Sequence, residues 1–205
     1  MRFKPFLSPL LGVFLVCGAV PAFSQVAPEA TRGGLPLVVG GGFSDYDIDF
    51  DGVTRMQGLS VWAQYYFEGY RFVPRGLALD VEGHDIAFGV PKSFTTIPGY
   101  KHMREAVAEG GPLYSWQHYR NFHPYAKFLI GHGGIDFPPV GCCYAHDTRT
   151  VYSPGGGIEY RTYKNIWVRG DYEYEFWPKL FGTTALTPSG FTVGASYDFG
   201  HRSEY

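Results

Sequence analysis

The chain closes on Gly190-Phe191-Thr192-Val193-Gly194-Ala195-Ser196-Tyr197-Asp198-Phe199, and this stretch decides the fold. Apolar or aromatic residues occupy every odd position from 191 to 199, and small or polar residues lie between them. A period of two is typical of a β-strand whose two faces meet different surroundings. The stretch therefore predicts a strand with one aromatic, apolar face and one small, polar face.

The same alternation recurs along the chain and predicts an all-β fold. The predicted strands cover residues 35–49, 56–68, 76–88, 102–117, 124–135, 150–162, 166–176 and 190–199. Residues 76–88 show the alternation most clearly, because Leu77, Leu79 and Val81 alternate with small and charged residues. We expect the apolar row of each strand to face outward, with glycine and charged residues facing inward.

The segment 102–117 is the least regular of these strands. Its first half, 102–109, has helix-forming composition, but the Gly-Gly-Pro run that ends at Pro112 would stop a helix. We interpret the whole segment as one strand, bulged at Pro112. A closed barrel of antiparallel strands, the architecture expected for this chain, needs an even number of strands. The expected outward residues are Ala106, Ala108, Tyr114 and Trp116.

Length and composition limit the ways in which this chain could cross a membrane. After residue 24 no segment has 18 consecutive apolar residues, so no helical span is predicted. Without such helices only a closed barrel satisfies every backbone group in lipid. Eight strands of about 10 residues use roughly half of the chain. Aromatic residues make up 18% of the sequence and glycine contributes 28 residues, both typical of such barrels.

The first 24 residues have the features of a secretory signal peptide. A basic start precedes an apolar run over 7–20, and Ala22-Phe23-Ser24 offers small residues for cleavage before Gln25. The run is short for a membrane anchor, and the bulky residue before Cys17 argues against a lipid anchor. We expect residues 25–34 to be a disordered lead, 35–199 the barrel, and 200–205 a short tail.

The predicted connections alternate in length. Those after the second, fourth and sixth strands are short, whereas 89–101, 136–149 and 177–190 are expected to be long loops. Transmembrane β-barrels have short turns on one side of the membrane and longer loops on the other. This alternation therefore places both chain termini on the side of the short turns, which is the periplasm if the barrel lies in an outer membrane.

The closing strand resembles the last strand of bacterial outer-membrane β-barrels. Thr192, Gly194, Tyr197 and Phe199 fit the polar-x-Gly-x-x-aromatic-x-aromatic signal that the barrel-insertion machinery reads in that family. The tail 200–205 departs from the family, in which many members stop at the aromatic residue.

Residues 35–199 as a whole resemble the small, porin-like barrel domain of the OmpA and OmpX-like families. The resemblance implies an eight-stranded antiparallel up-and-down transmembrane β-barrel, monomeric, in the outer membrane of a Gram-negative-type bacterium. Its implied partners are outer-membrane lipid, lipopolysaccharide and the insertion machinery. The formal net charge of −2 gives no indication of nucleic-acid binding.

Charged residues of both signs occupy inward positions. They are Asp80, Glu82, Glu159, Asp171, Glu173 and Glu175, together with Lys127, Arg161 and Arg169. The interior of an eight-stranded barrel holds little more than side chains, and buried charges there must pair. The first interpretation is a structural plug of ion pairs. The second is a gate in which the pairs exchange partners to open a narrow path.

Aromatic residues are concentrated toward the strand ends. They are Tyr65, Phe67, Tyr114, Trp116, Phe128, Tyr160, Tyr172, Tyr174, Phe176, Trp177, Tyr197 and Phe199. We interpret them as two girdles at the membrane interfaces. The alternative is the core of a soluble sandwich, but its other face would be rich in Lys, Thr and Ser.

Three possible chemical sites have weak support. Cys142 and Cys143, with His146 nearby, lack the spacing of a metal site, so we expect a loop disulfide or free thiols. Lipid A-modifying barrels need a nucleophile, a base and an acid. The candidates, His84 beside Asp85 and His201 with Ser203, match no catalytic signature.

We therefore expect no enzyme, cofactor or metal, and a structural or small porin-like role in the cell envelope. The alternatives are a soluble, lipocalin-like binder of small molecules and a lipid A-modifying enzyme.

Overall fold

The computed structural model describes most of the chain from residue 35 onward. The described residues are 35–48, 55–67, 71–88, 104–118, 120–140, 143–180 and 184–199. The predicted signal peptide, disordered lead and C-terminal tail lie outside them. No helix in the described part is long and apolar enough to cross a membrane.

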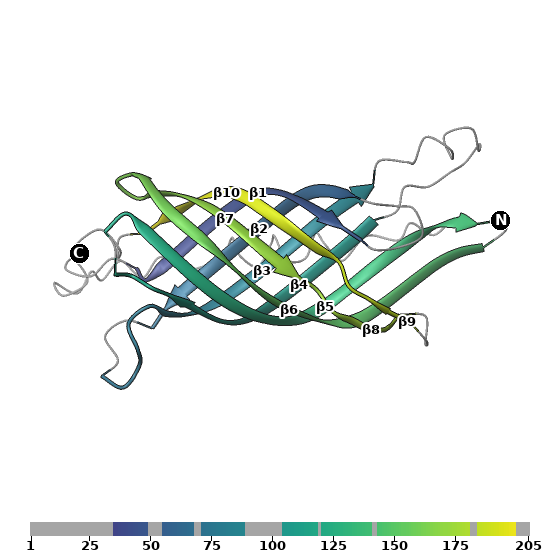
Figure 1. Cartoon of the computed structure of the whole chain (residues 1–205), viewed down its shortest axis with the longest axis horizontal. Helices are drawn as coiled ribbons and strands as arrows, with labels where there is room; N and C mark the ends of the chain where they lie inside the picture. Colours follow the sequence, from purple (N-terminus) through teal and green to yellow (C-terminus); the bar gives the residue numbers. More distant parts are fainter. Residues whose placement is uncertain are drawn as a thin grey trace, which may run out of the picture. The chain divides into compact units, whose positions relative to one another are not determined.

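Extended strands form almost all of the described structure (Figure 1). Their bounds are β1 Leu37–Asp47, β2 Met56–Tyr66, β3 Leu77–Phe88, β4 Arg104–Ser115, β5 Phe122–Val140, β6 Cys143–Tyr163, β7 Ile166–Tyr174, β8 Trp177–Leu180, β9 Thr184–Leu186 and β10 Ser189–Asp198.

Eight of the described strands close into a barrel in the order β1-β10-β7-β6-β5-β4-β3-β2. Each neighbouring pair is antiparallel. Closure is made by β1 and β10, which pair from Val38 opposite Asp198 to Asp47 opposite Ser189. The predicted eight-stranded antiparallel up-and-down barrel is therefore confirmed.

The apolar rows face outward, as predicted. On β2, Leu59 is 69% exposed and Val61 is 63% exposed, whereas the intervening Ser60 is buried. On β10, Phe191 and Val193 are exposed and Thr192 between them is buried. A soluble lipocalin-like barrel would place the apolar rows inside, so this arrangement argues against that alternative.

Residues 104–115 form a strand, but the bulge expected at Pro112 is wrong. Pro112 lies opposite Leu79, and the register with β3 runs through this position without a shift. On the β5 side the register is the same at Gly110 and at Leu113. Proline has no N–H to donate, so the ladder can lose a hydrogen bond here while the alignment of the strands is kept.

Two of the predicted long loops are also wrong, because they contain strands. Most of 136–149 belongs to the β5–β6 hairpin, which pairs as far as Val140 opposite Cys143, with an irregularity after Phe137. Among the described residues, the pairing of β4 with β5 reaches Asp136, and the β5–β6 hairpin continues past that position (Figure 1). Residues 177–180 and 184–186 form β8 and β9, which pair with each other antiparallel. The loop predicted at 89–101 lies outside the described residues.

The inside of the barrel has a polar layer between two apolar clusters. Along β3 the inward residues run Ala78, Asp80, Glu82, His84 and Ile86. Ala78 belongs to an apolar cluster with Val38, Tyr66, Leu113 and Tyr125. Ile86 belongs to a second apolar cluster, with Tyr46, Ile48, Met56, Val107, Ile135, Val151, Trp177 and Leu186. The charged residues therefore lie in the middle of the barrel, away from both ends.

Inward glycines make room for large side chains in this narrow interior. Gly40 lies opposite Trp62, and a methyl group at Gly40 would come within 2.4 Å of the Trp62 ring. We expect Gly40→Ala to destabilise the barrel by about 1–3 kcal/mol through overpacking. Gly170 provides the control, since a methyl group there meets nothing within 4 Å. Urea unfolding in detergent, followed by tryptophan fluorescence, compares the two variants, and equal stability would contradict this account of the packing.

Candidate functional site

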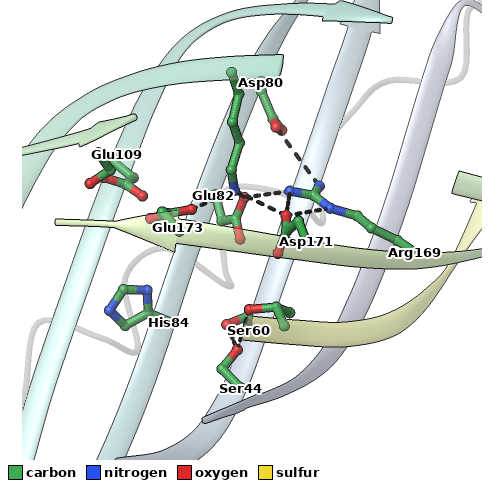
Figure 2. A network of polar contacts seen from close by, with 12 residues as sticks. Ser44, Ser60, Asp80, Glu82, His84, Glu109, Arg169, Asp171 and Glu173 are labelled. Atoms are coloured by element: carbon green, nitrogen blue, oxygen red, sulfur yellow. Dashed lines mark hydrogen bonds and ion pairs between the residues drawn. The ribbon is translucent and has the colours of Figure 1, made fainter. Parts of the chain in front are cut away.

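Arg169 is the centre of a charged network inside the barrel (Figure 2). Its Nη2 donates to Glu82 Oε2 at 2.9 Å, and its Nε donates to Asp171 Oδ2 at 2.9 Å. Its Nη1 lies 3.8 Å from Asp80 Oδ2. The guanidinium also lies over the Trp62 ring, 4.5 Å from its centroid. It also lies over the Tyr125 ring, 5.1 Å from that centroid. A buried arginine is therefore held by three carboxylates and two aromatic faces.

Lys127 is the second buried cation of the network. Its Nζ lies 2.5 Å from Glu173 Oε2, 2.7 Å from Glu82 Oε2 and 3.2 Å from Asp171 Oδ2. Glu82 and Asp171 therefore contact both cations. Tyr125 adds a neutral donor, because its hydroxyl donates to Asp171 Oδ2 at 2.7 Å.

The network joins strands that are not neighbours in the sheet. Asp80 and Glu82 come from β3, Lys127 from β5, and Arg169, Asp171 and Glu173 from β7. Because inward side chains recur at every second residue, each strand contributes consecutive members of the set. The order of strands places β7 across the barrel from β3, so the ion pairs extend across the interior.

Neutral and acidic groups extend the polar layer. Ser44 bonds to Ser60 at 2.5 Å and to Thr192 at 2.7 Å. Ser153 donates to Glu109 Oε2 at 2.6 Å. Thr192, predicted as part of the insertion signal, therefore also contacts the interior. Glu109 was missed as a network residue, although the outward positions expected for Ala106 and Ala108 already implied that it faces inward.

The remaining predicted network residues differ in position. Glu159 is buried opposite Arg169 in the β6–β7 register, and Glu175 is buried just beyond β7. Arg161 does not join the network, which corrects the prediction. It lies beside the turn after β6, where its Nε donates to the Lys164 carbonyl at 2.6 Å. The inward alternation reaches the barrel rim there, so the guanidinium bonds to the turn.

The one described pair considered for chemistry, His84 and Asp85, is not brought together. His84 is buried inside, whereas the adjacent Asp85 faces outward and accepts a hydrogen bond from Arg104 Nε at 2.8 Å. His146 is exposed, with its Nδ1 2.5 Å from Asp136 Oδ1. The possible disulfide of Cys142 and Cys143, like His201 and Ser203, lies outside the described side chains.

Aromatic pairs lie on the outer surface at the ends of β2, β4 and β10. Edge-to-face contacts join Tyr65 with Phe67 at 5.7 Å, Tyr114 with Trp116 at 5.1 Å, and Tyr197 with Phe199 at 5.0 Å between ring centroids. All three pairs lie at the same end of the barrel, because β2, β4 and β10 run in the same direction. Such rings are typical of a membrane interface.

Trp177 is an exception among the predicted girdle residues. It is buried inside the barrel, and its Nε1 donates to Glu175 Oε2 at 2.7 Å. The inward parity of β7 continues through Glu175 to Trp177, which explains why this ring turns away from the outer surface.

An apolar outer surface around a charged interior defines a transmembrane β-barrel. The chain matches the family model described as outer membrane protein beta-barrel domain over residues 12–199, and it belongs to this family. The predicted resemblance is therefore confirmed. Membership implies a location in the outer membrane of Gram-negative bacteria.

Solved structures of small outer-membrane barrels share the fold. The attachment invasion locus protein Ail of Yersinia pestis is 16% identical, with a TM-score of 0.56, and the match covers 80% of this chain and 97% of that one. Neisserial surface protein A is 13% identical, with a TM-score of 0.59 and coverage of 82% and 100%. OprG of Pseudomonas aeruginosa is 12% identical, with a TM-score of 0.55 and coverage of 82% and 98%.

No curated protein matches the chain. At these low identities the structural matches establish the fold and leave the role to be argued from the site.

Proposed function

We propose that this protein is a non-catalytic outer-membrane barrel with a structural role and a closed interior. The observation that carries the proposal is the pair of buried cations, Lys127 and Arg169, which carboxylates hold from more than one wall. In this proposal the charged network is a plug, and the barrel is neither a pore nor a gate.

The cost of moving a buried charge supports the plug. To open a path, Arg169 or Lys127 would have to leave its carboxylates, and breaking a buried ion pair costs about 3–5 kcal/mol. Apolar clusters on both sides of the polar layer add a second obstacle to ions. A small porin-like role is the alternative, and it requires both obstacles to move.

The outer surface supports the proposed partners. Its exposed apolar and aromatic side chains suit lipid and lipopolysaccharide, and a monomer needs no further covering of that surface. Tyr197 and Phe199 face outward at the end of β10, where the insertion machinery could contact them. Export by the predicted signal peptide completes this route to the outer membrane.

The geometry gives little support to lipid A chemistry. A nucleophile and its base must lie within hydrogen-bond reach of each other. His84 and Asp85 instead face opposite sides of the barrel wall. The proposal therefore assigns no catalytic role to this pair.

Conductance in planar bilayers tests the proposal. We expect no discrete current steps from the purified wild-type protein, and none from Arg161→Ala, because Arg161 lies outside the network. Lys127→Ala removes a cation from the plug itself. If the network were a gate, the conductance would change in Lys127→Ala and stay unchanged in Arg161→Ala. Reproducible steps from the wild type would overturn the closed interior, and a bacterial porin serves as the positive control.

A further inference from the structure

A second polar cluster lies inside the barrel and takes no part in the ion-pair network. We propose that His84, Glu105 and Glu175 bind one divalent transition-metal ion of the Zn²⁺ type. Nothing in the sequence pattern pointed to this site, because its members come from separate strands.

The three side chains converge at distances that suit a shared metal ion. One ligand atom from each lies within 4.8 Å of the others. His84 Nε2 is 3.3 Å from Glu175 Oε1 and 3.7 Å from Glu105 Oε1. Tetrahedral zinc with bonds near 2.1 Å separates its ligands by about 3.4 Å. The two distances lie on either side of this value.

Buried atoms without partners point to a missing ligand. His84 Nε2, Glu175 Oε1 and both carboxylate oxygens of Glu105 are buried and have no hydrogen-bond partner. The side chains of Glu105 and Glu175 are fully buried, and that of His84 is 1% exposed. Such groups are costly to leave unsatisfied. A single cation between them would satisfy an atom from each.

The charge balance at the cluster also favours a dication. Lys127 and Arg169 are engaged with the four carboxylates of the central network. Among the described residues, no lysine or arginine forms an ion pair with Glu105 or Glu175. Two carboxylates and a neutral imidazole carry a charge of −2, which balances a charge of +2. The imidazole and the small number of ligands favour a transition metal over Mg²⁺ or Ca²⁺.

The fold holds the ligands in place. His84 and Glu105 lie on the same inward face of the paired strands β3 and β4, two residues apart in register. Glu175 approaches from beyond β7 on another wall. Trp177 Nε1 binds the second oxygen of Glu175 at 2.7 Å, which leaves Oε1 toward His84. Hydrogen bonds of this kind orient metal-binding carboxylates.

Refolding of the full barrel from metal-free urea into detergent, with Zn²⁺ or Co²⁺ present, tests the proposal, because the apolar clusters close the interior of the folded barrel to ions. A Cys142→Ser, Cys143→Ser background removes the loop thiols. After free metal is removed by gel filtration, we expect one equivalent of bound Zn²⁺ by atomic absorption and chelator competition, and a Co²⁺ absorption spectrum typical of low coordination. Binding should be lost in His84→Gln and Glu105→Gln, and weakened about 10–100-fold in Trp177→Phe. The surface variant His146→Gln should bind like its parent.

Each variant is first shown to be folded by its heat-dependent shift on a gel. Wild-type barrel that refolds in the presence of metal and retains neither Zn²⁺ nor Co²⁺ would overturn the proposal, and would favour a proton shared between Glu105 and Glu175. Undiminished binding by folded His84→Gln would also overturn it. Neither result bears on conductance, so failure of the metal site is distinguishable from failure of the closed barrel.

Discussion

Arg169→Ala should destabilise the barrel by about 3–5 kcal/mol, because it leaves buried carboxylates without their cation. Asp80, Glu82 and Asp171 all approach this guanidinium, and each is nearly inaccessible to solvent. Lys127 remains, but it already contacts Glu173 as well as two of the three. Urea unfolding in lipid vesicles, followed by the gel shift of the folded barrel, measures the loss.

Arg104→Ala is the matched control for Arg169→Ala. Arg104 pairs with Asp85 on the outer surface, where both side chains are more than half exposed. Exposed ion pairs contribute about 0–1 kcal/mol, so this change should be small. A triple variant, Arg169→Gln with Glu82→Gln and Asp171→Asn, should recover part of the lost stability, because two of the carboxylates that Arg169 held become neutral amides. Equal effects of the two alanine variants would contradict the network's structural importance.

Val61→Arg should also be strongly destabilising, by about 2–4 kcal/mol, if the exposed row of β2 faces hydrocarbon. Val61 is 63% exposed and lies midway between the aromatic Tyr65 and the polar Gln57 on the same face. A charge placed there would meet the middle of the bilayer. Refolding into vesicles, followed by unfolding in urea, gives the difference from the wild type.

The cost of an arginine should depend on depth along β2. Gln57 already donates to the Asp45 carboxylate at 3.2 Å, beside Arg55, so Gln57→Arg enters a polar border. Near an interface the expected cost is about 0–1 kcal/mol. If Val61→Arg were as well tolerated as Gln57→Arg, the apolar row would not face lipid.

The sequence alone could predict the barrel because lipid and interior impose opposite demands on alternate residues. In β10 this contrast separates Phe191 and Val193 from Thr192 without any knowledge of the partner strands. The inward positions of Lys127 and Arg169 followed from the same parity. Local alternation therefore fixes which way a residue points.

Alternation could not predict where strands stop or which residues meet across the barrel. The Pro138-Pro139 pair indicated a loop, yet the β5–β6 hairpin continues past it with an irregular register. Trp177 looked like a girdle residue because aromatic side chains occur both on the outer surface and inside the barrel. The meeting of His84 with Glu175 depends on the order of strands around the barrel, which no local pattern records.

Cysteine labelling of adjacent residues on β10 tests most directly whether lipid surrounds a closed interior. Ala195 is exposed on the outer surface and Ser196 is buried inside, and each can become cysteine with little change in size. The loop thiols are first removed by Cys142→Ser and Cys143→Ser. In vesicles, Ala195→Cys should react with a membrane-soluble fluorescent maleimide that then reports a hydrocarbon environment. Ser196→Cys should resist both this reagent and a charged, water-soluble thiosulfonate until the barrel is unfolded. Rapid reaction of folded Ser196→Cys with the charged reagent, or the reverse pattern of labelling, would contradict the account.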